Sequence, residues 1–231
     1  MNDSFSLGEP IAHEPTLSDQ AYDRLSALLI SGQIAPGDRL SMRDLAARLG
    51  VSVMPVREAV TRLAAMGALD VSRKRAATVP VMSVARFRDI AKVRIEVEGL
   101  AAAEAARRRT PDDLARIERA EAEFRALRDG QAPGAPSAVR LNQEYHFAVY
   151  AAAHSPTLIE VITPLWLKIG PVLNLDLREN PERLQKGDAA NCHAEALEAI
   201  RDGNADRARA AIARDIAGAA DFIIDQGRLA P

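Results

Sequence analysis

Apolar residues recur every three or four positions along most of the chain, which is the spacing of a helix with one buried face. The first third of the chain contains three such helices, over 18–31, 41–49 and 52–66. Gly50 ends the second of them, because glycine accepts the left-handed backbone conformation that terminates helices. Two short apolar stretches, 69–72 and 77–81, then predict a pair of strands.

The two helices joined at Gly50 have the layout of a helix-turn-helix. Ser41 with Asp44 is a capping start for the first helix, and we expect Ser52 to cap the second. The buried stripe of the second helix is Val56, Val60, Leu63 and Met66. A different face carries Met54, Arg57 and Thr61, which could enter the major groove of DNA. An ordinary helical hairpin in a core, with Arg57 merely solvated, is the alternative interpretation.

The predicted strand pair carries three adjacent cations between its strands. Arg73, Lys74 and Arg75 stand at the tip, where they suit contact with phosphate or the minor groove. A basic hairpin directly after a helix-turn-helix is typical of a wing, although a solvated turn would look the same. Nine cations and six anions give residues 16–81 a net charge of +3, whereas the whole chain carries −2. The proposed DNA-binding part is therefore the basic part of the chain.

Beyond residue 81 the pattern is helical throughout. Helices are predicted over 83–108, 111–129, 137–153, 187–202 and 204–226, with a further one from Ser155-Pro156. In that further helix, Pro164 should cause a kink and Gly170-Pro171 a bend or an end, and 174–185 should be irregular. The fold class is therefore mainly α: an N-terminal winged helix-turn-helix with a small β-hairpin wing, and an all-α helical-bundle domain.

Polar residues interrupt the apolar faces of three of these helices. Asn142 and His146 share one face of 137–153, His193 lies on the apolar face of 187–202, and Asp215 on that of 204–226. Buried polar groups need partners, and helical bundles build metal sites from inward-facing side chains of this kind. Hydrogen-bonded core residues without a metal are the alternative for each of them.

Residues 17–81 resemble the winged helix of the GntR family of bacterial transcription regulators. The matching segments are 21–25, 31–40, 43–46, 49–52 and 55–59. The resemblance implies that Arg43 and Arg57 contact DNA, and that Ser52, Val53, Met54 and Pro55 form the groove-facing start of the second helix. The family usually has arginine at Val53 and often threonine at Met54, so its usual operator is not expected here. Ala76 stands near the place of the family's wing-tip glycine.

Residues 85–226 resemble the helical effector domain of the FadR-like branch, the FCD domain. The matching residues are Arg94 with Glu98, segment 142–146, Ser155-Pro156, and His193 followed by 199–205. Many members hold a divalent metal with one aspartate and three histidines. By that resemblance Asn142, His146, His193 and Asp215 are the ligands here, with Asn142 in place of the aspartate and Asp215 in place of a histidine. This mixed N/O set is compatible with Zn, Ni, Mn or Fe, or with a metal-free ion pair.

The expected effector is a small organic acid held by Arg94. An arginine fork binds a carboxylate through two hydrogen bonds, and small residues continue its helical face past Glu98. An internal pair between Arg94 and Glu98, four residues apart, is the alternative.

The rest of the composition bears on the location of the protein and on its division into domains. The 231 residues contain no apolar run of about 18 or more, so no membrane span is expected, and residues 1–15 read as a flexible tail without a secretory pattern. The single cysteine, Cys192, excludes an internal disulfide and fits a cytoplasmic location. We expect domains at 16–81 for DNA binding and 82–231 for effector binding and dimerisation.

Together these features predict a cytoplasmic homodimeric transcription regulator that reads a short pseudo-palindromic DNA operator. The resemblance favours repression over activation. Two other classes compete with this interpretation: a metal-dependent hydrolase fused to a DNA-binding module, and a DNA-architectural protein without an effector. No separate nucleophile or general base has a recognisable spacing, so no catalytic residue is assigned.

Overall fold

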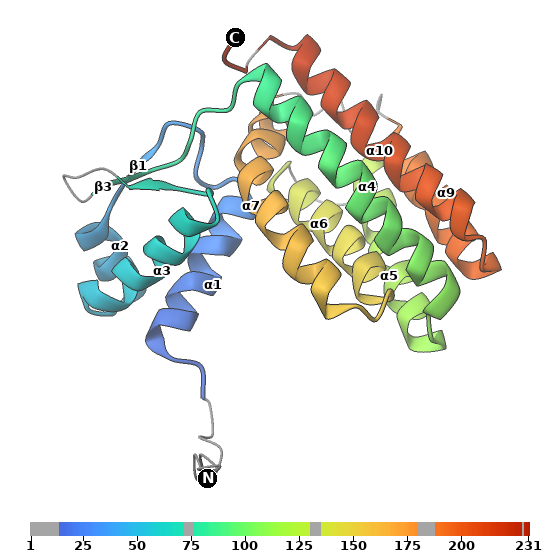
Figure 1. The fold of residues 1–231 in the computed structure, drawn as a ribbon, viewed down its shortest axis with the longest axis horizontal. Coiled ribbons are helices and arrows are strands. Elements are labelled where there is room, and N and C mark those ends of the chain that lie inside the picture. The colour runs from blue at the N-terminus through green and yellow to red at the C-terminus, as the bar shows by residue number, and fades with distance from the viewer. Residues whose placement is uncertain (1–13, 72–75, 130–134, 180–187, 228) are drawn as a thin grey trace, which may run out of the picture.

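The N-terminal part of the protein is a winged helix (Figure 1). The computed structural model describes residues 14–71, 76–129, 135–179, 188–227 and 229–231. In chain order the first elements are α1 (Leu17–Ile30), β1 (Arg39–Ser41), α2 (Met42–Leu49), α3 (Val53–Ala65), β2 (Asp70–Val71) and β3 (Ala76–Thr78). Leu25 and Leu29 of α1 and Val56, Val60 and Leu63 of α3 are fully buried and form the centre of this part of the core.

The turn between α2 and α3 forms as the sequence predicts, with one exception. Gly50 has φ of +68° and ends α2, and the Ser41 hydroxyl accepts a hydrogen bond from the Asp44 N–H at 3.4 Å. Ser52 occupies the N-cap position of α3, but its side chain makes no capping hydrogen bond, so that prediction is wrong. The reason lies three residues on, because Pro55 stands where the capped N–H would be and proline has none.

The small sheet has three antiparallel strands in the order β1-β3-β2. Leu40 pairs with Ala77 on one side of β3, and Val71 pairs with Ala77 on the other. The β2 and β3 strands are shorter than the predicted 69–72 and 77–81, and β1 was not predicted. Three residues are too few to show strand alternation, and β1 forms only because β3 lies beside it. The predicted wing tip, with Arg73, Lys74 and Arg75, lies outside the described residues.

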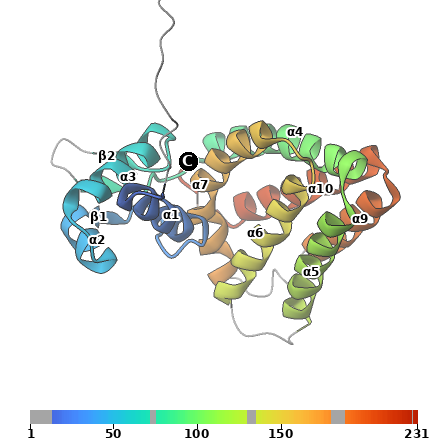
Figure 2. The ribbon, with the colours of Figure 1, turned by 90° about the horizontal axis from the view of Figure 1, so that it is seen from below.

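Six helices make up the rest of the described chain. They are α4 (Val84–Arg108), α5 (Pro111–Arg128), α6 (Ala135–Ala151), α7 (Pro156–Glu179), α9 (Ala189–Asp202) and α10 (Ala205–Asp225). Helix α10 packs along α4 and α9, and α5 packs on α6 and α9, and Figure 2 shows these helices gathered in one bundle. Their bounds agree with the predicted helices to within two residues, apart from α7.

Helix α7 does not stop at Gly170-Pro171. It contains both Pro164 and Pro171 and continues to Glu179, so an end at Gly170 and an irregular start at 174 are both wrong. Packing compensates for the missing proline N–H groups, since Trp166 and Leu167 are fully buried. The stretch Pro156–Leu173 is long and apolar enough to cross a membrane by length and composition. Here it is a core helix that packs against α1, α4 and α6.

The winged helix contacts the helical bundle where α1 meets α7 (Figures 1 and 2). The contact is backbone against backbone: a Cβ atom on Gly170 would lie 2.7 Å from Ile30 Cα and from the Leu29 carbonyl oxygen. The C-terminal end of the chain adds a second tie, because Ala230 exchanges hydrogen bonds with Met82 and Val84 in the connection to α4. The two parts therefore meet beside the linker that joins them.

Candidate functional site

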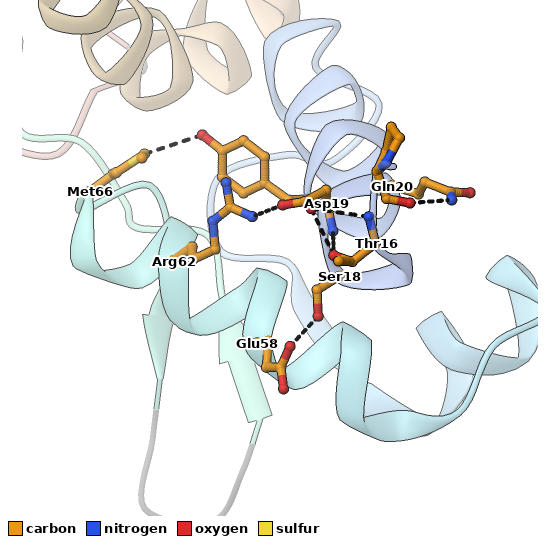
Figure 3. A network of polar contacts seen from close by, with 9 residues as sticks. Thr16, Ser18, Asp19, Gln20, Glu58, Arg62 and Met66 are labelled. Atoms are coloured by element: carbon orange, nitrogen blue, oxygen red, sulfur yellow. Dashed lines mark hydrogen bonds and ion pairs between the residues drawn. The ribbon is translucent and has the colours of Figure 1, made fainter. Parts of the chain in front are cut away.

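One flank of the exposed face of α3 is held by α1. Arg62 pairs with Asp19, with 2.7 Å between Nη1 and Oδ1, and its guanidinium lies 4.1 Å from the centre of the Tyr22 ring. Glu58 accepts a hydrogen bond from the Ser18 hydroxyl. Figure 3 shows this network between the two helices. Because Glu58 and Arg62 already have partners, they orient α3 on α1 and are not free to bind elsewhere.

The rest of that face carries Met54, Arg57 and Thr61, and all three are exposed. The Arg57 guanidinium makes no hydrogen bond or ion pair with any residue that the structure describes, and neither does that of Arg43 on α2. The Thr61 hydroxyl donates to the Arg57 carbonyl at 2.8 Å. An exposed arginine without an internal partner, at the start of the second helix of a helix-turn-helix, can reach base edges or phosphates.

The second candidate site is a buried cluster of three side chains from three helices. His146 comes from α6, His193 from α9 and Asp215 from α10, and their ligand atoms all lie within 4.8 Å of one another. Asp215 Oδ2 lies 3.1 Å from His146 Nε2 and 3.7 Å from His193 Nε2. The structure thus brings together three of the four predicted ligands.

His193 has the features of an unsatisfied ligand. Both of its ring nitrogens are buried and neither has a hydrogen-bond partner among the described residues. The ring is stacked on Tyr145, with centroids 4.0 Å apart, and Phe124 packs on it at 4.7 Å. Burial lowers the pKa of His193, which favours the neutral imidazole that binds metal ions. A buried polar atom without a partner is costly, and a metal ion would satisfy one of these nitrogens.

A chain of hydrogen bonds from α4 sets the orientation of His146. Arg94 donates to both oxygens of Glu98, at 2.5 Å and 2.9 Å, and Tyr150 donates its hydroxyl proton to Glu98. The Tyr150 oxygen lies 2.9 Å from His146 Nδ1. Since the only tyrosine proton goes to Glu98, the hydrogen bond to His146 requires a proton on Nδ1. His146 Nε2 then faces Asp215 either with a second proton or with a lone pair directed at a shared cation.

Asp215 supplies the negative charge of the cluster. Burial acts to raise the pKa of Asp215, but the two imidazoles that face it outweigh this effect and hold the pKa well below its usual value. The carboxylate therefore stays ionised and available as a ligand. Two imidazoles and one carboxylate are ligands that suit Zn and its first-row neighbours, so the residues present fit a divalent metal.

A cavity of about 270 Å³ opens beside the cluster. His146, Asp215 and the fourth predicted ligand, Asn142, line it, and Asn142 is half-buried. Its remaining wall is mostly apolar and includes Phe124, Val139, Leu173, Ile216, Ala219 and Phe222. Two more charged side chains, Asp188 and Arg214, also border it. The cavity can therefore take a small molecule with a polar end near the cluster and an apolar body.

Arg94 and Glu98 form the internal pair that the sequence left open as the alternative. Both are buried, and the hydrogen bonds of Arg94 to described residues use Nε and Nη2. Arg94 also lines the cavity and lies over the Trp166 ring at 4.9 Å. Its Nη1 group is therefore the part of the fork outside the pair. Burial disfavours the charge of Arg94, but the Glu98 carboxylate outweighs this, and the pKa of Arg94 is raised.

Several residues of this site were missed from the sequence, and Tyr150 and Arg214 illustrate two reasons. Tyr150 follows Asn142 and His146 at the same four-residue spacing on α6, so extending that face by one turn would have found it. Arg214 precedes Asp215 on α10 and borders the cavity, where it also pairs with Glu195. Nothing in the sequence pattern marks Arg214, because it belongs to the solvated side of its helix.

Comparison with known proteins places the chain among regulators. Residues 17–79 match the family model "Bacterial regulatory proteins, gntR family", and residues 89–218 match the FCD domain. The chain is 34% identical over 160 residues to the HTH-type transcriptional regulator McbR of Escherichia coli K12, covering 69% of this chain and 71% of McbR. These matches confirm the resemblance stated from the sequence.

Solved structures agree with the fold. The E. coli McbR/YncC structure superposes with a TM-score of 0.84 at 29% identity, over 92% of this chain and 99% of that one. A GntR structure from Rhodococcus sp. RHA1 superposes with a TM-score of 0.70 at 21% identity, over 90% and 97% of the two chains, and bears on the fold alone. The winged helix and the helical domain are thus both those of known regulators.

Proposed function

The chain belongs to the gntR family of bacterial regulatory proteins, with an FCD domain, and we propose that it is a metal-dependent repressor that senses a small organic acid. Members of this family are DNA-binding transcription regulators and not enzymes, so the hydrolase alternative is set aside. The observation that carries the proposal is the unsatisfied His193 beside His146 and Asp215, at the wall of a cavity, in a chain that also exposes Arg57.

For DNA, we assign the outward face of α3 to the major groove. Arg57 reads a base edge, Thr61 and Met54 flank it, and Arg43 contacts the backbone of the duplex. Val53 and Pro55 lie half-buried beside them at the start of α3. Arg73, Lys74 and Arg75 supply phosphate or minor-groove contacts from the wing. The division of the chain at 16–81 and 82–231 follows from these roles and belongs to the same proposal.

The protein acts as a cytoplasmic homodimer on a short pseudo-palindrome in this proposal. A two-fold symmetric dimer presents two copies of α3, so its operator repeats the same half-site in inverted order. Helices α4 and α7, which pack on each other, carry exposed apolar side chains at Val93, Leu100 and Val161. Exposed apolar groups on adjacent helices support a contact between copies of the helical domain.

In the effector domain, His146, His193, Asp215 and Asn142 hold a divalent metal, with Zn, Ni, Mn and Fe as candidates. When bound, the metal supplies a Lewis-acidic position for a carboxylate oxygen. The side chains of the protein orient the ligands and bind the acid. Tyr150 and Glu98 hold the His146 ring in place, Arg94 Nη1 hydrogen-bonds the acid, and the apolar wall around Phe222 excludes water from its body.

The ligand reaches the DNA-binding part through α7 and α4. Leu173 lines the cavity three residues after Gly170, the residue on which α1 rests. Arg94 lies on α4, which begins directly after the linker. A ligand that shifts either helix changes the placement of the winged helices, and with it the population of DNA-competent dimers.

Metal analysis and selection of DNA test this proposal on the full-length protein. Elemental analysis of untagged protein should find about one divalent metal per chain, and chelation should lower the melting temperature reversibly. Selection from a random DNA pool should return an inverted repeat bound by a dimer. If the purified protein contains no metal and its melting temperature does not respond to added Zn, Ni, Mn or Fe, the metal is excluded from the proposal. A pool that yields no preferred sequence would remove the operator.

A further inference from the structure

We propose that Met54 reads the 5-methyl group of a thymine in each half-site of the operator. The inference rests on the proposed placement of α3 in the major groove, and it adds a base preference that Arg57 alone would not give. It assigns Met54 a role in sequence specificity through apolar contact and not through hydrogen bonding.

Met54 is the outlier on its helix. Its side chain is 56% exposed, whereas Val56, Val60 and Leu63 on the same helix are fully buried. It is the second residue of α3, and it is exposed, whereas its half-buried neighbour Val53 packs against the hydrophobic core. A large flexible apolar side chain held in water at the start of a helix gains stability only when another molecule covers it.

The position of Met54 relative to its polar neighbours indicates what covers it. It is exposed at the start of α3, one turn before Arg57 and also one turn before Glu58, where the pairs with α1 begin. Residues in the first turn of such a helix are those that reach base edges. Met54 therefore stands where a base contact is made, with a side chain that has no N–H or O–H to offer.

Among the groups that DNA presents in the major groove, one is apolar: the C5-methyl of thymine. A methionine covers it with polarisable thioether and methylene groups, and its sulfur is only a weak acceptor for a cytosine amino group in its place. The rise between residues three apart on a helix is about 4.5 Å, and successive base pairs are about 3.4 Å apart. The thymine should therefore lie within one or two base pairs of the base that Arg57 contacts, for which guanine is the commonest partner of arginine.

Replacement of thymine by deoxyuridine tests the proposal, because it removes only the methyl group. The duplex is the operator selected by the full-length protein, with each thymine of the half-site replaced in turn. Replacement at one position should weaken binding about fourfold per half-site, which is the effect of losing the burial of one methyl group, and about fifteenfold when both half-sites are changed. The other thymines should be neutral.

Protein variants separate a Met54 contact from an effect of uracil on DNA shape. Met54→Ala should bind the thymine and uracil operators equally, and it should fold normally because the side chain is exposed and alanine favours helices. Leu17→Ala is the matched control: Leu17 is a similarly exposed apolar residue, at 53%, but it belongs to α1 and not to α3, and its loss should leave the thymine preference unchanged.

The outcomes are distinct. Selective binding in which no thymine can be distinguished from uracil, or a Met54→Ala variant that keeps the full preference, would overturn this inference and leave the proposed function intact. Failure to select any sequence would overturn the DNA-binding part of the proposed function, and this inference with it.

Discussion

Polar side chains are treated in opposite ways in the two halves of this molecule. On α3, Arg57 is exposed and its guanidinium has no partner among the described residues, while its neighbours Glu58 and Arg62 are tied to α1. Around the cavity, buried polar groups are bonded in a chain from Arg94 to His146, whereas both ring nitrogens of His193 lack a hydrogen-bond partner among the described residues, as does the indole nitrogen of Trp166. Arg57 and His193 mark where something from outside the chain is expected.

The difference lies in what an unpartnered group costs. An exposed guanidinium is hydrated, so leaving Arg57 free costs the protein little. A buried imidazole loses its hydrating water, and His193 regains no hydrogen bond among the described residues, so its burial is costly until a ligand satisfies it. The exposed face of α3 can therefore remain without DNA at little energetic cost. The buried cluster, in contrast, should be stabilised markedly by its ligand.

The largest effect is expected from emptying the inner site. His146→Ala combined with His193→Ala should reduce the metal content from about one per chain to near zero. The protein should remain folded, although less stable, because the double variant removes the unsatisfied nitrogens of His193 but also leaves the buried Asp215 without its two imidazole partners. Elemental analysis and size-exclusion chromatography measure the two quantities. Stoichiometric metal in the double variant would show that the site lies elsewhere.

On the outer face, Arg57→Ala should remove about 1–3 kcal/mol of base discrimination at each half-site and abolish specific binding. Arg62→Ala is the matched control five residues further along α3, since its guanidinium is already held by Asp19 and Tyr22. We expect it to keep the operator preference and to lose at most about 1 kcal/mol of folding stability, as exposed pairs do. Fluorescence anisotropy on selected and scrambled duplexes compares them. Equal operator affinity for Arg57→Ala and the wild type would remove Arg57 from the readout.

The hydrogen-bond chain can be cut without touching a metal ligand. Tyr150→Phe removes the bridge between Glu98 and His146 Nδ1, so the imidazole loses its fixed orientation. Loss of such a supporting bond costs metal affinity about 10- to 100-fold. Competition with a chelating dye measures that affinity, and the melting temperature of the metal-free protein reports any separate loss of stability. Unchanged metal affinity would mean that Tyr150 is only a core residue.

The contact between the two halves is tested at Gly170. Gly170→Ala places a methyl group 2.7 Å from the backbone of α1, and overpacking of this kind costs about 1–3 kcal/mol. Gly218→Ala on α10 is the control, because no atom lies within 4 Å of its added Cβ; it should gain about 0.5–1 kcal/mol from better helix propensity. Thermal unfolding of both variants measures these two changes in stability. Equal stability of Gly170→Ala and the wild type would contradict the close approach of α1 and α7.

Local patterns sufficed for much of this structure. The faces of α3, α9 and α10 follow from residue spacing, and so Met54, Arg57, His193 and Asp215 could be placed before any coordinates. The series of hydrogen bonds from Arg94 through Glu98 to Tyr150 and His146 joins α4 to α6. It could not be predicted, because helical spacing within one segment does not show which helices meet. The continuation of α7 past Gly170 and Pro171 was misjudged for a similar reason, since burial of Trp166 and its neighbours offsets a local penalty. The missing cap at Ser52, by contrast, could have been predicted from Pro55.

The account depends most on the coupling between the two unpartnered sites, and operator affinity with and without a cavity ligand measures it directly. The ligand would be a carboxylate that raises the melting temperature of the metal-loaded protein. We expect it to change operator affinity at least fivefold, a coupling of about 1 kcal/mol, and to have no effect after chelation or in the His146→Ala, His193→Ala variant. A carboxylate that binds the metal-loaded protein and leaves operator affinity unchanged, or acts equally without metal, would contradict the account.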